Sequence, residues 1–77
     1  MTARELVNSI RNSGPNGSGI ALSVTNSAGG VVMRIVPGDR PGSFRAIASE
    51  GIASLTRKEA LEYVREAMAA NLKVKQV

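Results

Sequence analysis

The chain has 77 residues, of which 43% are hydrophobic, and this length allows one small domain spanning residues 1–77. It contains no cysteine and no histidine, which excludes disulfides, thiolate chemistry and the commonest general base and metal ligand. The net charge of +4 favours weak attraction to nucleic acid or to an acidic protein surface. The N-terminus does not resemble a signal peptide, and no apolar run approaches the ~20 residues that span a bilayer. We therefore expect a cytoplasmic protein without a membrane segment.

The first predicted element is a helix over residues 3–13. Thr2 and Glu5 match a capping box, in which the side chain of each residue hydrogen-bonds the backbone of the other. Gly14 is suited to the left-handed conformation that ends many helices. The glycine-rich residues 14–19 are predicted to be a connector, because they follow a helix and lead to a strand. A phosphate-binding loop has the reverse context, after a strand and before a helix.

Three strands are predicted next. Residues 20–25 alternate apolar and polar side chains, and residues 31–36 are rich in β-branched residues. Turn-forming residues 26–30 lie between them and indicate an antiparallel hairpin. A loop rich in proline and glycine leads to a weaker third strand over residues 43–49. Residues 52–55 are predicted only as an extended connection to the last helix.

The strongest local pattern predicts a helix over residues 57–70. Thr56 and Glu59 match a second capping box. The apolar face of this helix is formed by Ala60, Leu61, Val64, Ala67 and Met68. Residues 72–77 are predicted to be a short edge strand or a frayed tail. The order helix, strand, strand, strand, helix predicts an α+β fold with a three-stranded antiparallel sheet and both helices packed on one face.

No combination of side chains predicts catalysis, a metal site or a cofactor site. Glu59, Glu62 and Glu66 alternate with arginine and lysine on the last helix, whereas acid–base catalysis requires a carboxyl that is buried or beside a like charge. Capping explains Thr2 and Thr56, and without histidine no hydroxyl has a base to activate it. We therefore expect a protein that is not an enzyme and needs no cofactor.

Alternation along the three strands divides their side chains between two faces. The inward face would hold Ile20, Leu22, Val24, Val31, Met33, Ile35, Phe44 and Ala46. The outward face would hold Ala21, Ser23, Thr25, Val32, Arg34, Val36, Arg45 and Ile47. This outward set is too apolar for a face that meets only water, and apolar residues framed by arginine are typical of protein interfaces. The candidate protein-binding residues are Val32, Arg34, Val36, Arg45 and Ile47. The alternative explanation is the general preference of β-branched residues for strands.

The basic residues support a second interpretation. Arg34, Arg40, Arg45, Arg57 and Lys58 are candidate nucleic-acid-binding residues if they converge on one surface that tracks phosphates. The predicted element order, with a basic pair opening the second helix, resembles the layout of double-stranded-RNA-binding domains. The Lys-Lys-x-Ala-Lys stretch of that family is Arg57-Lys58-Glu59-Ala60-Leu61 here, and its histidine between the first two strands is missing.

The sequence therefore predicts a small non-catalytic binding protein that contacts another protein, or a second copy of itself, through the outward sheet face. In size and layout it is similar to the small regulators and inhibitors carried by phages and mobile elements. A nucleic-acid-binding module is the alternative. A continuous basic strip with the glutamates of the last helix turned away would favour nucleic acid, whereas apolar residues ringed by charges would favour a protein partner.

Overall fold

The computed structural model describes residues 1–12 and 19–77. The predicted helix end at Gly14, and the predicted connector up to residue 18, lie outside these described residues. The helices and strands of the described part, in chain order, are α1 (Ala3–Ser9), β1 (Leu22–Thr25), β2 (Val31–Pro37), β3 (Ser43–Ala48), β4 (Gly51–Thr56), α2 (Arg57–Ala69) and β5 (Lys73–Gln76).

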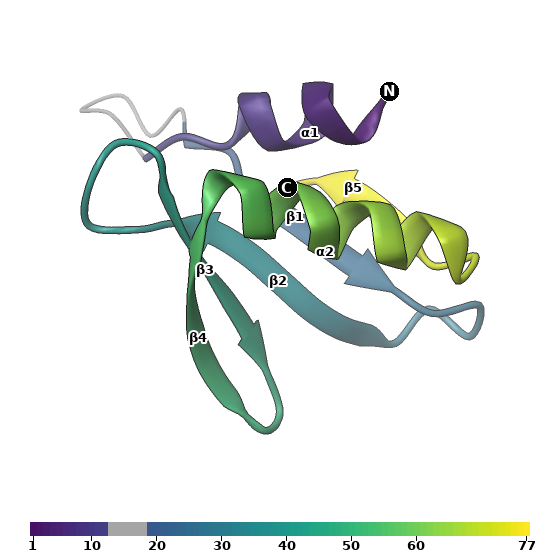
Figure 1. The fold of residues 1–77 in the computed structure, drawn as a ribbon. Coiled ribbons are helices and arrows are strands. Elements are labelled where there is room, and N and C mark those ends of the chain that lie inside the picture. Colours follow the sequence, from purple (N-terminus) through teal and green to yellow (C-terminus); the bar gives the residue numbers. More distant parts are fainter. Residues whose placement is uncertain (13–18) are drawn as a thin grey trace.

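The strands form one antiparallel sheet in the order β4-β3-β2-β1-β5 (Figure 1). Strands β1 to β4 follow one another as a meander, and α2 then carries the chain back across the sheet to β5. Strand β5 pairs with β1, with Leu22 opposite Gln76 and Val24 opposite Val74. Both helices cover the same face of the sheet, so the opposite face has no covering layer within the described part of the chain (Figure 1).

The predicted three-stranded sheet is therefore wrong, because the α+β fold has a five-stranded sheet. The two further strands are the two edges of the sheet. The region of β4 was predicted only as an extended connection, and the region of β5 as either a short edge strand or a frayed tail. Strand β4 contains Ala53 and Ser54, which have little intrinsic strand preference, and it forms because the chain folds back so that Ile52 lies opposite Ile47. Strand β5 has one apolar residue, Val74, and the strand forms because it pairs with β1.

Both predicted capping boxes are present. The Thr2 hydroxyl accepts a hydrogen bond from the Glu5 backbone N–H at 3.2 Å, and the Glu5 carboxylate accepts one from the Thr2 backbone N–H at 3.0 Å. Helix α1 nevertheless ends at Ser9 and not at residue 13. Ile10 has an extended backbone, and Arg11 exchanges two backbone hydrogen bonds of 3.0 Å with Ile20. The chain thus leaves the helix after Ser9 because Arg11 pairs with Ile20, just before β1.

The second capping box joins β4 directly to α2. The Thr56 hydroxyl accepts from the Glu59 N–H at 3.2 Å, and the Glu59 carboxylate accepts from the Thr56 N–H at 2.9 Å. The last residue of β4 is therefore also the cap of the helix, which fixes where the chain turns from the sheet into the helical layer. Val64 is fully buried, Leu61 is half-buried and Met68 is exposed, so the buried stripe of α2 is narrower than predicted.

The core lies between the sheet and the two helices. Its buried members are Ala3, Leu6, Val7, Leu22, Ile35, Phe44, Ala46, Leu55, Ala60 and Val64. Fully burying a side chain such as Leu22 contributes about 1.5–3 kcal/mol relative to leaving it exposed. The predicted inward position of Val31 is wrong, since its side chain is 62% exposed. The register between β1 and β2 shifts next to it, between Val24 and Thr25, and takes Val31 out of the alternation.

Candidate binding surface on the open sheet face

The strand register places the candidate residues of β2 and β3 in a compact two-by-two group. Arg34 lies opposite Ile47, and Val36 lies opposite Arg45. Side chains at such opposed positions have Cβ atoms about 4.5–5.5 Å apart, so each arginine stem runs beside an apolar neighbour. The sheet brings these four candidate protein-binding residues together on the face away from the helices.

The group extends across the whole sheet. Arg34 has Ser23 on its other side, and Ser23 is followed by Lys75 of β5. Ile47 is followed by Ile52 of edge strand β4. We call this surface the open face and define it by the outward side chains Ser23, Thr25, Arg34, Val36, Arg45, Ile47, Ile52, Ser54, Lys73 and Lys75. Its apolar residues Val36, Ile47 and Ile52 lie on β2, β3 and β4, whereas its lysines lie on β5.

The fifth candidate, Val32, has no partner on β1, because Val24 pairs with Met33 and Thr25 with Val31. It sits on β2 next to the register shift and is 44% exposed. It also lines a hollow of about 340 Å³ with Met33 and with Tyr63 of α2. Val32 therefore lies beside the helical layer, apart from the group formed by the other four candidates.

The open face carries positive charge without negative charge. The five strands contain Arg34, Arg45, Lys73 and Lys75 and neither aspartate nor glutamate. Four of the six acidic residues are on the helices, namely Glu5, Glu59, Glu62 and Glu66. The other two lie in the turns before β3 and β4. Acidic side chains are thus concentrated in the layer behind the sheet.

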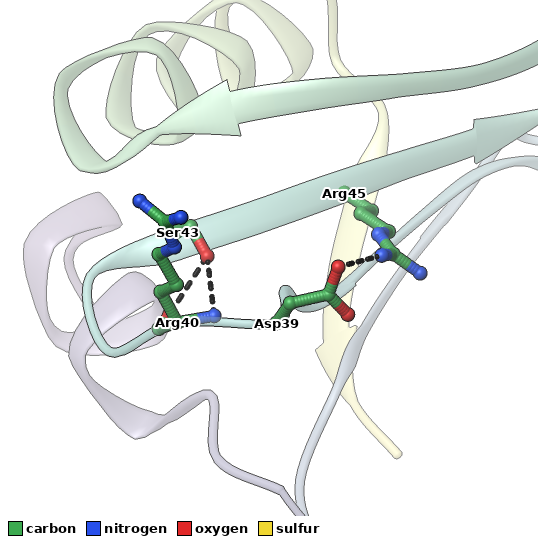
Figure 2. A network of polar contacts seen from close by, with 4 residues as sticks. All are labelled: Asp39, Arg40, Ser43 and Arg45. Carbon is green, nitrogen blue, oxygen red and sulfur yellow. Dashed lines mark hydrogen bonds and ion pairs between the residues drawn. The ribbon is translucent and has the colours of Figure 1, made fainter.

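The positive charge of Arg45 is partly compensated. Its guanidinium donates to the Asp39 carboxylate at 2.6 Å, and the two side chains are 42% and 81% exposed (Figure 2). An exposed pair of this kind contributes at most about 1 kcal/mol to stability. The same loop is held by Ser43, whose hydroxyl donates to the Arg40 carbonyl at 2.7 Å and accepts from the Arg40 N–H at 3.1 Å. Asp39 is therefore presented by an ordered turn beside the open face.

The residues of the nucleic-acid alternative are divided between surfaces. Arg34 and Arg45 are on the open face. Arg40 and Arg57 line a different hollow, of about 320 Å³, at the end of the sheet beneath the last turn of α1. Lys58 is on the first turn of α2, in the helical layer.

Three basic residues outside the list of candidate residues lie at the open face. Lys73 and Lys75 belong to it because β5 is an ordered strand, and the alternation Lys-Val-Lys was the available signal. Arg11 joins Arg34 in lining a shallow hollow of about 390 Å³, together with Val36 and Val77. No sequence signal placed Arg11 there, because its position follows from the backbone pairing with Ile20.

Within residues 1–12 and 19–77, no group of three or more acidic, histidine or cysteine side chains is arranged to hold a metal ion. None of the helices in this part is long and apolar enough to cross a membrane. Comparisons of the chain with models of protein families, with curated proteins and with solved structures find no significant match.

Proposed function

We propose that the chain is a small non-catalytic binding protein whose open face engages an acidic, partly apolar surface of another protein, as a regulator or inhibitor does. The observation that carries the proposal is the composition of this uncovered face. Its four cations have no carboxylate among them on the strands. The exposed Ile47 lies opposite Arg34, and the exposed Ile52 lies on the other side of Ile47. Large apolar side chains in contact with arginine favour burial against a protein partner.

The absence of aromatic side chains from the open face also favours a protein partner over single-stranded nucleic acid. Phe44, the one aromatic residue in a strand, is 5% exposed and lies in the core. Tyr63 is on α2. A sheet that binds single-stranded nucleic acid stacks bases on aromatic residues, and here no such residue is presented. The face instead presents isoleucine and valine, which gain from contact with other apolar groups.

The experiment compares two aspartate substitutions of matched exposure on opposite faces. Ile47 is 37% exposed on the open face, and Met68 is 39% exposed on α2. Immobilised wild type, Ile47→Asp and Met68→Asp are incubated with nuclease-treated cell lysate, and the captured proteins are compared by mass spectrometry. We expect Ile47→Asp to lose a partner that Met68→Asp retains, because a carboxylate would be desolvated without a counter-ion. Circular dichroism establishes that both variants fold. Capture that is identical for all three proteins would contradict the proposal.

A specific observation favours nucleic acid as the second candidate. Arg11 and Arg34 line the same hollow on the open face, and Glu59, Glu62 and Glu66 are on the helix behind the sheet. Such a surface can follow a phosphate backbone. In that case the affinity for mixed RNA and DNA duplexes would fall steeply as salt rises, and Ile47→Asp would matter less than Arg34→Ala. Weak duplex binding that is equal for wild type and Arg34→Ala would exclude this candidate.

A further inference from the structure

The two edges of the sheet differ in how they resist pairing with another strand. Edge strand β5 carries Lys73 and Lys75, and lysine is a common means of keeping an edge from pairing. Edge strand β4, Gly51–Thr56, carries no charged residue and no proline. No strand follows β4 on its outer side within the described part of the chain. The chain thus protects one edge of its sheet and leaves the other open.

The first four residues of β4, Gly51 to Ser54, are exposed on both faces of the strand, whereas Leu55 is buried in the core. Ile52 is 69% exposed on the open face, and Ala53 is exposed on the opposite one. Figure 1 shows the β3–β4 hairpin projecting away from α2, toward the bottom of the view, so that the helix does not cover the tip of the hairpin. An uncharged strand that is exposed on two faces and one edge is a template for a further strand.

The hairpin geometry fixes which backbone groups are available. Ser49 and Glu50 form a two-residue turn between the paired residues Ala48 and Gly51. Residues that flank such a turn exchange hydrogen bonds with each other, and the alternation of an antiparallel ladder then turns every second residue outward. The N–H and C=O groups of Ile52 and Ser54 are therefore directed away from β3, toward an incoming strand.

The charges that flank β4 indicate which incoming strand would pair with it. Glu50 directly precedes β4, and Arg57 and Lys58 directly follow it. In an antiparallel pair of two β4 strands centred on Ala53, Glu50 of each copy lies opposite Thr56 of the other, next to Arg57. The Glu59 carboxylate at this end is already bound to the Thr56 N–H. We propose that β4 pairs antiparallel with β4 of a second copy of this chain, with two symmetric contacts between Glu50 and Arg57.

This arrangement agrees with the charge of the rest of the sheet. Two open faces placed against each other would bring like charges together at Arg34, Lys73 and Lys75, which is unfavourable. Edge pairing avoids this contact, since the two-fold axis of an antiparallel strand pair is perpendicular to the sheet. Both open faces then lie on the same side of one continuous sheet, and both helical layers on the other. The inference concerns the edge of the sheet and does not depend on what the open face binds.

The first test exchanges the flanking charges. The mass of the protein is measured by sedimentation equilibrium over a concentration series at low salt, for wild type, Glu50→Arg, Arg57→Glu and the double variant. We expect a wild-type dimer, weakened about tenfold or more by each single change, because two attractive contacts become repulsive. The double variant restores the opposite charges and keeps the net charge of +4, so it should dimerise like wild type. A wild-type monomer at all concentrations would overturn the proposal, as would equal dimerisation of all four proteins.

The second test removes one outward N–H from each edge. Ser54→Pro does so on β4. Gln76→Pro does so on β5, because Ala21 and Val77 exchange hydrogen bonds and the neighbouring Gln76 therefore points outward. We expect Ser54→Pro to be monomeric and Gln76→Pro to remain dimeric. The reverse result would place the contact at β5 and overturn the proposal. If Ser54→Pro does not fold, as judged by circular dichroism, the charge exchange decides. Partner binding by the open face is measured by capture from lysate, and dimerisation through β4 is measured by sedimentation. Either proposal can therefore fail while the other holds.

Discussion

Arg34 of β2 lies directly opposite Ile47 of β3, and this pair marks where the basic and the apolar parts of the open face meet. Toward β5, the same row of the sheet continues through Ser23 to Lys75. Toward β4, it continues to Ile52. The arrangement depends on register, because a slip of one residue would turn Arg34 into the core and Ile35 to the outside. The burial of Ile35 therefore keeps Arg34 and Val36 on the open face.

Truncation to alanine should have a large effect on stability in the core and a small one on the open face. Leu22 is fully buried, and we expect Leu22→Ala to lower the free energy of unfolding by about 2–5 kcal/mol through lost burial and a cavity. Ile47→Ala on the open face should change it by less than about 0.5 kcal/mol. Urea unfolding of both variants checks this. A large loss for Ile47→Ala would show that the open face is part of the stabilising core and not a free surface.

Local sequence patterns predicted the parts of the fold that are determined locally. Both capping boxes and the outward positions of Arg34, Val36, Arg45 and Ile47 follow from short-range spacing. Strand β4 could not be predicted in this way, because Ala53 and Ser54 become a strand only through pairing with β3.

The same limit applies to the candidate site. Its β2 and β3 residues could be predicted, since alternation alone assigns a face. Ile52 could not, because its place depends on an edge strand that long-range pairing creates. For Lys73 and Lys75 the sequence left an edge strand and a frayed tail open, and only the pairing of β5 with β1 places them on the open face. Arg11 depends on a backbone bridge to Ile20, which is set by tertiary structure. The charge of the open face was therefore underestimated from the sequence.

The junction between β4 and α2 predicts a specific cost of losing one hydroxyl. Thr56→Ala removes the acceptor for the Glu59 N–H and should lower the free energy of unfolding by about 1 kcal/mol. Ser54→Ala is the control, because Ser54 is also an exposed β4 residue but makes no side-chain hydrogen bond within the described part of the chain. Denaturant unfolding of the two variants should differ by about that amount. Equal midpoints would indicate that the cap contributes nothing to the fold.

The first capping box predicts a dependence of stability on pH. Hydrogen bonds from the backbone and side chain of Thr2 lower the pKa of Glu5 below its ordinary value of 4.5. A carboxyl whose pKa is lower in the folded state contributes stability above its unfolded pKa and loses it as pH falls through its folded pKa. Glu5→Gln keeps an acceptor for the Thr2 N–H but does not titrate.

We therefore expect wild type to be more stable than Glu5→Gln at neutral pH and to lose that advantage on acidification. The measurement is the unfolding midpoint of both proteins from about pH 7 to about pH 3. A difference between them that is constant over this range, or that grows toward acid, would contradict the role of the ionised carboxylate.

The ion pair beside the open face predicts how the charge of that face can be increased. Asp39→Asn removes the carboxylate that lies 2.6 Å from the Arg45 guanidinium, so the full positive charge of Arg45 joins that of Arg34. Glu62→Gln on α2 raises the net charge of the chain by the same amount, but in the layer behind the sheet.

If the positive field is concentrated on the open face, Asp39→Asn should be retained more strongly than Glu62→Gln on immobilised heparin. Arg34→Ala should elute at lower salt than wild type. Because the exposed pair contributes at most about 1 kcal/mol, Asp39→Asn should remain folded. Elution of Asp39→Asn and Glu62→Gln at the same salt concentration would show that retention depends on net charge and that the open face does not direct it.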